Sequence, residues 1–368
     1  MIPVFRPFSG QEEIDAVAKT IRDGWWGMGP RTAEFEARFG ESVGAEYCLG
    51  TSSGTAALQL ALTAAGVEGR EVITPALTFV SANHAILQAR GRPVFADVDP
   101  QTLTMDPAEV ERNISPRTAA VIPMDYGGHP AELDEIRAIA RKHGVAVVED
   151  AAHACGATYR GRPVGSISDI TCFSFQAVKN LAMGEGGAIT FSDRSWEGRL
   201  RRLRYLGVDR DPSQRSTAAG YAWAYDVDEI GWKSHLSDIP ASIGLVQLAR
   251  LPQTNGRRRE IVGQYLEALA DLEWLELPLE KSYVRSAWYL FAVRVASRDR
   301  FMSHLADRGV ASGVHFKPSH LYRPYLEFGG RLPVTDREWP RLVSLPLFPG
   351  LTSAEVDQVI SAVRSFDP

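Results

Sequence analysis

FSFQAVKNLAMGEGGAI, residues 173–189, is the most informative stretch of the chain. Its apolar start predicts a strand that ends at Phe175, and AITF after the glycines predicts a second strand. Lys179 follows the first strand in a turn that the glycines allow to be tight. A lysine held between two buried strands is poorly solvated, which lowers its pKa and exposes a nucleophilic amine. Taken alone, the stretch equally fits a surface lysine on a glycine-rich hairpin.

Upstream of this stretch, short apolar runs alternate with helical patterns from about residue 50 to residue 190. Helical periodicity covers Val80–Arg90 and Ala131–His143. The alternation predicts βαβ units and an α/β fold whose mostly parallel sheet is buried on both faces. Ligands bind beyond the carboxyl ends of such strands, so polar residues there are candidates for the site. The apolar runs are EVITP at 71–75, PVFADV at 93–98, AAVIPM at 119–124, VAVVED at 145–150 and ITCFSF at 170–175.

After Gly220 the sequence pattern changes. Proline ends most helices, so Pro252 is expected to separate two helices there. The pattern predicts a smaller α+β C-terminal domain, and we divide the chain into a large domain over residues 1–248 and a small domain over residues 249–368. The expected elements are helices over Asp238–Leu251 and Arg257–Leu272, a strand at YLFAVRV (289–295), a helix near Arg300–Arg308 and a final helix after Ser353.

Composition excludes several classes of protein. The 368 residues carry 40 Lys and Arg against 45 Asp and Glu, a net charge of −5, whereas nucleic-acid binding needs a strongly basic domain. No apolar stretch approaches the roughly 20 residues of a membrane-spanning helix, and the start MIPVFRPFSGQEEI does not resemble a signal peptide, so we expect a cytoplasmic protein. We expect the three cysteines, Cys48, Cys155 and Cys172, to be reduced core thiols rather than metal ligands. We expect the two basic runs, Arg199–Arg204 and Arg257–Arg259, to form solvated helix faces.

A possible anion site lies at GTSSGTAALQLAL, residues 50–62. Small hydroxyl and glycine residues open a predicted helix there. The free N–H groups and the helix dipole at Ser53, Gly54 and Thr55 can hold a phosphate. A simple N-cap explains the same residues.

A carboxylate and a histidine follow the strand in VAVVEDAAHACGA, residues 145–157. Asp150 is predicted at the carboxyl end of this strand, with His153 three positions later. A partly buried aspartate needs a cationic partner to remain ionised. Alternatively, Asp150 caps a following helix.

An aromatic residue follows another strand in TPALTFVSANHAI, residues 74–86. Phe79 lies just past the strand end, where its ring could stack on a flat heterocycle. Packing in the core is the competing interpretation.

Together the four features are what a protein must supply to use pyridoxal 5′-phosphate as an electron sink: an amine, an anion cradle, a carboxylate and an aromatic plate. Their order along the chain, phosphate loop then Phe79 then Asp150 then Lys179, matches the fold-type I enzymes that use this cofactor.

Nearly the whole sequence closely resembles the nucleotide-sugar aminotransferase family of the DegT/StrS type. The order of so many motifs makes the resemblance specific. It implies a fold-type I transferase with a large cofactor-binding domain and a smaller C-terminal domain. The segments that carry it are IPVFRPFSGQEEIDAV, GWWGMGPRTAEFEARF, GTSSGTAAL, PALTFVSANHAI, VEDAAHA, FSFQAVKNLAMGEGGAI, IGWKSHLSDIPASIGLVQL and GVHFKPSHLYRPY.

The resemblance implies a role for each matching residue. Lys179 forms the Schiff base with the cofactor, Asp150 pairs with the pyridine nitrogen and His153 contacts the ring hydroxyl. Phe79 covers the ring face. The residues implied for the phosphate are Ser53, Gly54, Thr55 and Ser174.

The resemblance also implies a homodimer whose sites are shared between subunits. In the family, a polar residue of the segment that matches GWKSHLSDI, often asparagine, reaches the phosphate of the second subunit. This chain has Lys233, Ser234 and His235 there, and its sequence leaves open which of them crosses.

The implied reaction is a ping-pong transamination from an amino acid, usually glutamate, to a keto-sugar on a nucleoside diphosphate, with Lys179 as the general base. We expect cations of the substrate-side segments to meet the acceptor's phosphates or the donor's carboxylate. The competing interpretation of the cations is a set of solvated surface charges, and the two interpretations of the tryptophans are a cleft wall and simple packing. The candidates are Arg6, Trp25, Trp26, His315, Lys317 and His320.

Several other activities compete with this one. The related sugar 3-dehydratases have histidine where this chain has Lys179, which argues against dehydration. Aminocyclitol and aminohydroxybenzoate synthesis are not separated from sugar amination by the cofactor motifs. A non-catalytic regulatory protein that binds the cofactor would need an output domain, and the sequence offers no basic helix-turn-helix segment.

Overall fold

A seven-stranded sheet forms the centre of the computed structural model, which describes residues 1–209, 216–217, 220–221 and 224–368. The strand order is β1-β9-β8-β5-β4-β2-β3. β9 is antiparallel to both of its neighbours, and the pairs from β8 to β3 are parallel, so the predicted α/β sheet is confirmed. The strands are β1 (Tyr47–Thr51), β2 (Glu71–Pro75), β3 (Arg92–Ala96), β4 (Thr118–Val121), β5 (Ala146–Asp150), β8 (Ile170–Ser174) and β9 (Gly187–Phe191).

Helices cover both faces of this sheet because successive strand side chains point in opposite directions. Val72 and Val148 pack with α3, α4 and α7, whereas Ile73 and Val147 pack in a separate cluster with α5 and α6. Phe173 joins α2 in a third cluster. These helices are α2 (Pro30–Val43), α3 (Gly54–Ala64), α4 (Val80–Gln88), α5 (Pro107–Asn113), α6 (Leu133–His143) and α7 (Glu197–Arg204).

The C-terminal part has its own three-stranded antiparallel sheet, in the order β12-β14-β15. Val293 and Leu345 of this sheet form one core cluster with Phe301, Val359 and Tyr265. The predicted strand and helices are therefore present. The elements are β12 (Leu275–Glu276), β14 (Phe291–Val295), β15 (Leu342–Leu345), α10 (Arg298–Asp307), α11 (Pro333–Glu338) and α12 (Ser353–Arg364).

Short elements connect these parts. Two small sheets pair β13 with β6 and β7, and β10 with β11. The strands are β6 (Thr158–Tyr159), β7 (Arg162–Pro163), β10 (Ser216–Thr217), β11 (Gly220–Tyr221) and β13 (Val284–Arg285), and the 3-10 turns are η1 (Tyr126–Gly128), η2 (Arg194–Trp196), η3 (Ser319–Leu321), η4 (Arg323–Phe328) and η5 (Trp339–Arg341).

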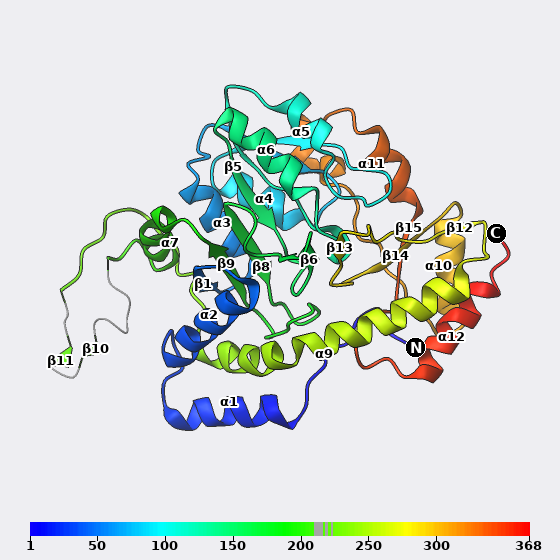
Figure 1. Ribbon diagram of the computed structural model, residues 1–368, viewed down its shortest axis with the longest axis horizontal. Coiled ribbons are helices and arrows are strands. Elements are labelled where there is room, and N and C mark those ends of the chain that lie inside the picture. Colours follow the sequence, from blue (N-terminus) through cyan, green and yellow to red (C-terminus); the bar gives the residue numbers. More distant parts are fainter. Residues whose placement is uncertain (210–215, 218–219, 222–223) are drawn as a thin grey trace.

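One long helix, α9 (Asp238–Leu269), links the two parts, with α1 (Gln11–Asp23) beside its first half (Figure 1). The prediction of two helices separated near Pro252 is wrong, because α9 continues through this proline. A proline inside a helix costs about 3 kcal/mol. Burial of residues on both sides of it, including Leu251 and Ile261 in two different core clusters, offsets that cost. The division at residues 248 and 249 falls within α9 and stays a proposal.

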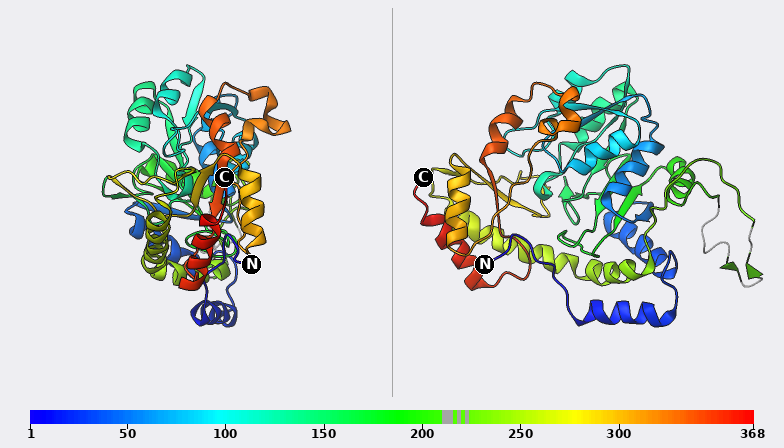
Figure 2. Two further views of the ribbon diagram at one scale, coloured as in Figure 1. Left: turned by 90° about the vertical axis from the view of Figure 1, so that its right-hand side faces the viewer. Right: turned by 180° about the vertical axis from the view of Figure 1, so that it is seen from behind.

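The views in Figure 2 show α9 extending from the central sheet toward α10 and α12, where the C-terminus lies.

The expectation that the basic runs are solvated helix faces is wrong for two of their arginines. Arg204 is 1% exposed and pairs with Glu36, and Arg258 is 3% exposed and donates to the Leu347 carbonyl at 2.8 Å. Both lie where a helix meets buried backbone or a carboxylate from another element. The three cysteines are free and buried, as predicted.

Within the described ranges, no helix is both long and apolar enough to span a bilayer. Over the same residues, no cluster of His, Cys, Asp and Glu side chains is arranged to hold a metal ion.

Candidate active site

A cavity of about 470 Å³ lies at the carboxyl ends of β5 and β8. The register of these strands places Asp150 beside Cys172, so that Asp150 and Ser174 end neighbouring strands at one edge of the sheet. The cavity brings together nine of the residues singled out in the sequence: Ser53, Gly54, Thr55, Phe79, Asp150, His153, Ser174, Lys179 and His315.

An anion cradle forms one wall of this cavity, where α3 begins. Ser53 is its N-cap, and the Ser53 hydroxyl and carbonyl oxygens accept the N–H groups of Ala56 and Ala57 at 3.1 and 3.0 Å. In the described structure the N–H groups of Gly54 and Thr55 have no such partner and remain available to a phosphate. The N-cap and the predicted anion site are therefore compatible.

Asp150 ends β5 and is 4% exposed. One of its carboxylate oxygens accepts the Ala152 N–H at 3.1 Å. Burial raises the pKa of Asp150, whereas the Ala152 N–H and the Lys179 amine oppose the rise. No helix begins between Asp150 and Thr158, all of which the structure describes, so the interpretation of Asp150 as a helix cap is wrong.

Lys179 lies in the turn between β8 and β9, where its N–H donates to the Gln176 carbonyl at 2.8 Å. Its side chain lines the cavity rather than an open hairpin surface. Burial lowers the pKa of Lys179 to about 8, and Asp150 acts in the opposite direction. An amine with this pKa is partly neutral near neutral pH and can act as a base or a nucleophile.

His153 is 2% exposed, and its Nδ1 accepts the Gly127 N–H at 3.3 Å. Burial lowers the pKa of His153 well below its usual value, and the Lys179 charge adds to this effect, so the ring is neutral. Phe79 precedes α4 and is 55% exposed, so it is not a core residue. Its ring lines the cavity, and its centre lies 5.6 Å from the ring centre of Phe316.

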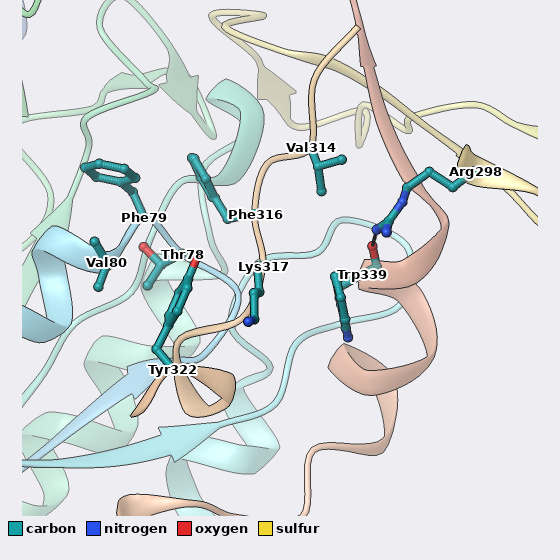
Figure 3. Close-up of a pocket in the computed structure, with 9 residues that line it drawn as sticks. All are labelled: Thr78, Phe79, Val80, Arg298, Val314, Phe316, Lys317, Tyr322 and Trp339. Carbon is teal, nitrogen blue, oxygen red and sulfur yellow. Dashed lines mark hydrogen bonds between the residues drawn. The ribbon is translucent and has the colours of Figure 1, made fainter. Parts of the chain in front are cut away.

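Figure 3 shows the residues that line a second cavity of about 320 Å³. This cavity adjoins the first, because Phe79 and Phe316 line both. Lys317 lines this outer cavity, with its amine 4.9 Å from the ring centre of Tyr322. The Arg298 guanidinium lies 5.2 Å from the ring centre of Trp339. The outer cavity therefore combines two basic side chains with aromatic walls, and the Arg298 guanidinium also pairs with Asp299 at 3.0 Å.

Of the other substrate-side residues, only His315 lines the inner cavity in this chain. Its Nδ1 lies 2.8 Å from the Ser344 hydroxyl, and burial, followed by the Lys179 charge, lowers the pKa of His315 to about 4. His320 is buried instead, with its Nε2 at 3.0 Å from Asp336, because its segment turns into the core after Lys317.

Arg6 and Trp26 line neither cavity. Arg6 lies 3.9 Å from Glu355 and over the ring of Phe348, both in the C-terminal part of the chain. The Trp26 indole donates to the carbonyl of Ile21, at the end of α1. Trp25 likewise donates to a nearby carbonyl, that of Met28.

The segment expected to reach a second subunit runs beside the phosphate loop of its own chain. The Ser234 carbonyl accepts the Ser52 N–H at 2.7 Å, and His235 pairs with Thr51 through the backbone. Lys233 is exposed. Contact of Lys233 or His235 with a partner's phosphate stays a prediction.

Three aromatic residues of the inner cavity were missed in the sequence: Phe5, Tyr289 and Phe316. Phe316 lies in the quoted segment GVHFKPSHLYRPY and Tyr289 opens the predicted strand YLFAVRV. Neither sequence pattern distinguishes an aromatic residue that faces a cavity from one in the core. The one feature of the sequence that could have pointed to Phe316 and Tyr289 is that they lie in or near the quoted motifs.

The residues present fit pyridoxal phosphate. The cradle accepts a phosphate, Asp150 suits a protonated ring nitrogen, Lys179 supplies the amine and Phe79 supplies a ring. At Gly54, a Cβ atom would lie 2.7 Å from the Cβ of Ser174, so this corner has room only for glycine beside a bound anion.

Known proteins agree with this geometry. SpsC of Bacillus subtilis (strain 168), a spore coat polysaccharide biosynthesis protein, is 40% identical over 99% of this chain and 96% of its own. The sugar aminotransferase CalS13 from Micromonospora echinospora has a TM-score of 0.93 at 33% identity, over 99% of this chain and 100% of its own. Spr1654 from Streptococcus pneumoniae, solved in PMP and PLP forms, has TM-scores of 0.93 and 0.91 at 31% identity, over 99% of this chain and 98% of its own.

The fold-type I architecture and the pyridoxal phosphate cofactor expected from the sequence are thereby confirmed. Residues 7–364 match the DegT/DnrJ/EryC1/StrS aminotransferase family. The chain belongs to this family and is a pyridoxal phosphate-dependent aminotransferase.

Proposed function

We propose that this enzyme transfers an amino group from glutamate to a keto-sugar carried on a nucleoside diphosphate. The observation that carries the proposal is the position of the Lys179 amine and the Asp150 carboxyl on the walls of one cavity, which adjoins an outer cavity lined by Lys317 and Arg298. The sugar aminotransferase CalS13 and the polysaccharide biosynthesis protein SpsC support a sugar acceptor.

When bound, pyridoxal phosphate withdraws electrons from the carbon that bears the reacting amine and makes its C–H acidic. We assign the phosphate to Ser53, Gly54, Thr55 and Ser174. With the cofactor bound, Asp150 would face the ring nitrogen and favour its protonated form, because a buried carboxylate and a cation stabilise each other. His153 would contact the ring hydroxyl, and Phe79 would cover the ring face.

Lys179 is the proton carrier in both halves of the proposed reaction. Its Nζ removes a proton from the α-carbon of the amino donor. In the return half it places a proton on the carbon that was the sugar ketone. A pKa of about 8 suits both tasks, because the amine is neither fully protonated nor a weak base near neutral pH. The two substrates occupy the same cavity in turn and both react beside the Lys179 amine. The product of the donor must therefore leave before the acceptor binds, which makes the kinetics ping-pong.

The outer cavity supports an acceptor with a charged extension. Lys317 and Arg298 lie on its walls, and the rings of Tyr322 and Trp339 line it with them. Two cations suit a diphosphate, and the aromatic rings suit a nucleobase. A keto-cyclitol would have no group to place there. We therefore favour the nucleotide-linked sugar over an aminocyclitol acceptor.

We also infer that the enzyme works as a homodimer in the cytoplasm. The dimer is supported by the path of residues 233–235 beside the phosphate loop, from which Lys233 or His235 could complete a neighbouring site. The cytoplasmic location is supported by the three buried cysteines, which are free, as is usual in reducing compartments.

The test is an acceptor screen in two half-reactions. Glutamate or glutamine first converts the cofactor to its amine form, and keto-sugar nucleotides, free keto-sugars and keto-cyclitols are then added while the absorbance of the aldehyde form is followed. We expect glutamate and a keto-sugar nucleotide to be the active pair. Lys317→Met should raise KM for that acceptor but not for glutamate, whereas Lys142→Met, at an exposed lysine paired with Glu111, should change neither. Restoration of the absorbance by cyclitols alone would overturn the proposal.

A further inference from the structure

We propose that Tyr289 is a positioning residue that holds the free Lys179 amine at the reacting centre through the face of its ring. This inference rests on the role proposed for Lys179 above. It adds a residue from outside the motifs that carry the cofactor chemistry.

The geometry of the pair is that of a cation over an aromatic face. The Lys179 Nζ lies 4.3 Å from the ring centre of Tyr289. A lysine ammonium is attracted to an aromatic ring within about 6 Å, and the attraction is stronger where water is excluded. Tyr289 is 3% exposed, so the contact is made in a largely dry environment.

The ring of Tyr289 packs against two other aromatic rings. It stacks on Phe5, with ring centres 5.2 Å apart and planes at 11°, and on His153, at 4.1 Å and 29°. The next residue, Leu290, donates its N–H to the Gly127 carbonyl at 3.1 Å. The ring therefore offers Lys179 a fixed surface rather than a mobile one.

Such a surface meets a need of the proposed reaction. Between removing one proton and delivering another, Lys179 must carry a positive charge in a cavity whose burial disfavours that charge. A direct ion pair would raise the pKa of the amine, so that less of it would be unprotonated near neutral pH and the ammonium would release its proton less readily. An aromatic face stabilises the ammonium less and leaves the amine able to return a proton.

Other charged groups around Lys179 do not replace this contact. Asp150 of β5 attracts the amine electrostatically, and Glu185 lines the same cavity from the turn before β9. His153 and His315 have lowered pKa values and are neutral near neutral pH. Arg258 of α9 acts on Tyr289 itself, where its charge opposes the rise in the tyrosine pKa that burial causes.

The test compares Tyr289→Met, which fills similar space without an aromatic face, with Tyr289→Phe, which keeps the face. The rate at which the full-length, cofactor-free chain captures added pyridoxal phosphate is measured against pH, and its midpoint reports the proton affinity of Lys179. We expect Tyr289→Met to lower that affinity by about 3-fold to 30-fold. Tyr289→Phe should stay within about 2-fold of the parent, and both variants should have the circular dichroism spectrum of the folded chain.

The kinetic consequence is a lower kcat for Tyr289→Met with glutamate at an unchanged KM, and recovery in Tyr289→Phe. A midpoint in Tyr289→Met that is unchanged, or that moves to higher pH, would overturn the inference, because the ring would then serve only as packing or as a barrier to water. Failure of the role proposed for Lys179 is recognised separately, since Lys179→Ala would then retain turnover.

Discussion

Gly54 opens α3 and Ser174 ends β8, and a Cβ atom at Gly54 would lie 2.7 Å from the Cβ of Ser174. No real Cβ approaches another so closely, so the helix start and the strand end fit together only because position 54 has no side chain. This contact brings the free N–H groups of the helix and the Ser174 hydroxyl to one corner of the cavity.

Gly54→Ala should therefore weaken cofactor binding. The added methyl group must displace Ser174 or the first turn of α3, and overpacking of this kind costs about 1–3 kcal/mol, which is about 5-fold to 150-fold in Kd for pyridoxal phosphate. Fluorescence titration of the cofactor-free chain measures it. Gly263→Ala is the matched control, because nothing lies within 4 Å of that Cβ position in α9. Equal affinity in the two variants would show that the cradle does not bind the phosphate.

Lys179→Ala should abolish turnover, because no other amine lines the inner cavity in the described chain. The variant should also lose the absorbance of the covalently bound cofactor while keeping measurable affinity for it through the cradle. Lys142→Ala, at an exposed position, should behave as the parent enzyme does. A purified Lys179→Ala enzyme that aminates an acceptor at a near-normal rate would contradict the assignment.

Asp150→Asn should lower kcat by about 10²-fold or more, the loss expected when electrostatic stabilisation of a transition state is removed. The asparagine side-chain oxygen can still accept the Ala152 N–H, so the local turn is preserved. Steady-state kinetics with a thermal melt of the variant separate the two effects. If kcat is unchanged in a normally folded variant, Asp150 has only a structural role.

The lowered pKa of Lys179 predicts a pH dependence of stability. Burial lowers the pKa to about 8 in the folded chain from 10.5, so between these values the unfolded chain binds more protons. The free energy of unfolding of the cofactor-free chain should therefore rise with pH across this window, and the penalty is complete below pH 8. Urea unfolding at several pH values, compared with Lys179→Met, measures the effect. A difference between the two proteins that is constant from pH 8 to pH 10.5 would place Lys179 in water.

Most of the cofactor site could be predicted because its parts are local. The local sequence is enough to indicate the element in which each main residue lies: a helix start for Ser53, a strand end for Asp150 and a glycine-rich turn for Lys179. The parallel order of the strands then brings these ends to one edge of the sheet. The resemblance of the whole sequence to one family added the role of each residue.

The substrate side was harder to predict because a basic residue near a cleft has the same sequence pattern whether it faces the cleft or not. Lys317 lines the outer cavity and His315 the inner one, while His320, a few positions later, is buried against Asp336. Turns of the backbone between them decide which side chain faces which space.

The sequence by itself determined the class of fold, the cofactor and the residues whose chemistry serves it, because periodicity and motifs act over a few neighbouring positions. Only the tertiary structure decided that α9 continues through Pro252, that Arg204 and Arg258 are buried, and that Tyr289 lies under the Lys179 amine. Each of these depends on contacts between segments far apart in the chain, and the free energy of such contacts outweighs local preference without leaving a local pattern.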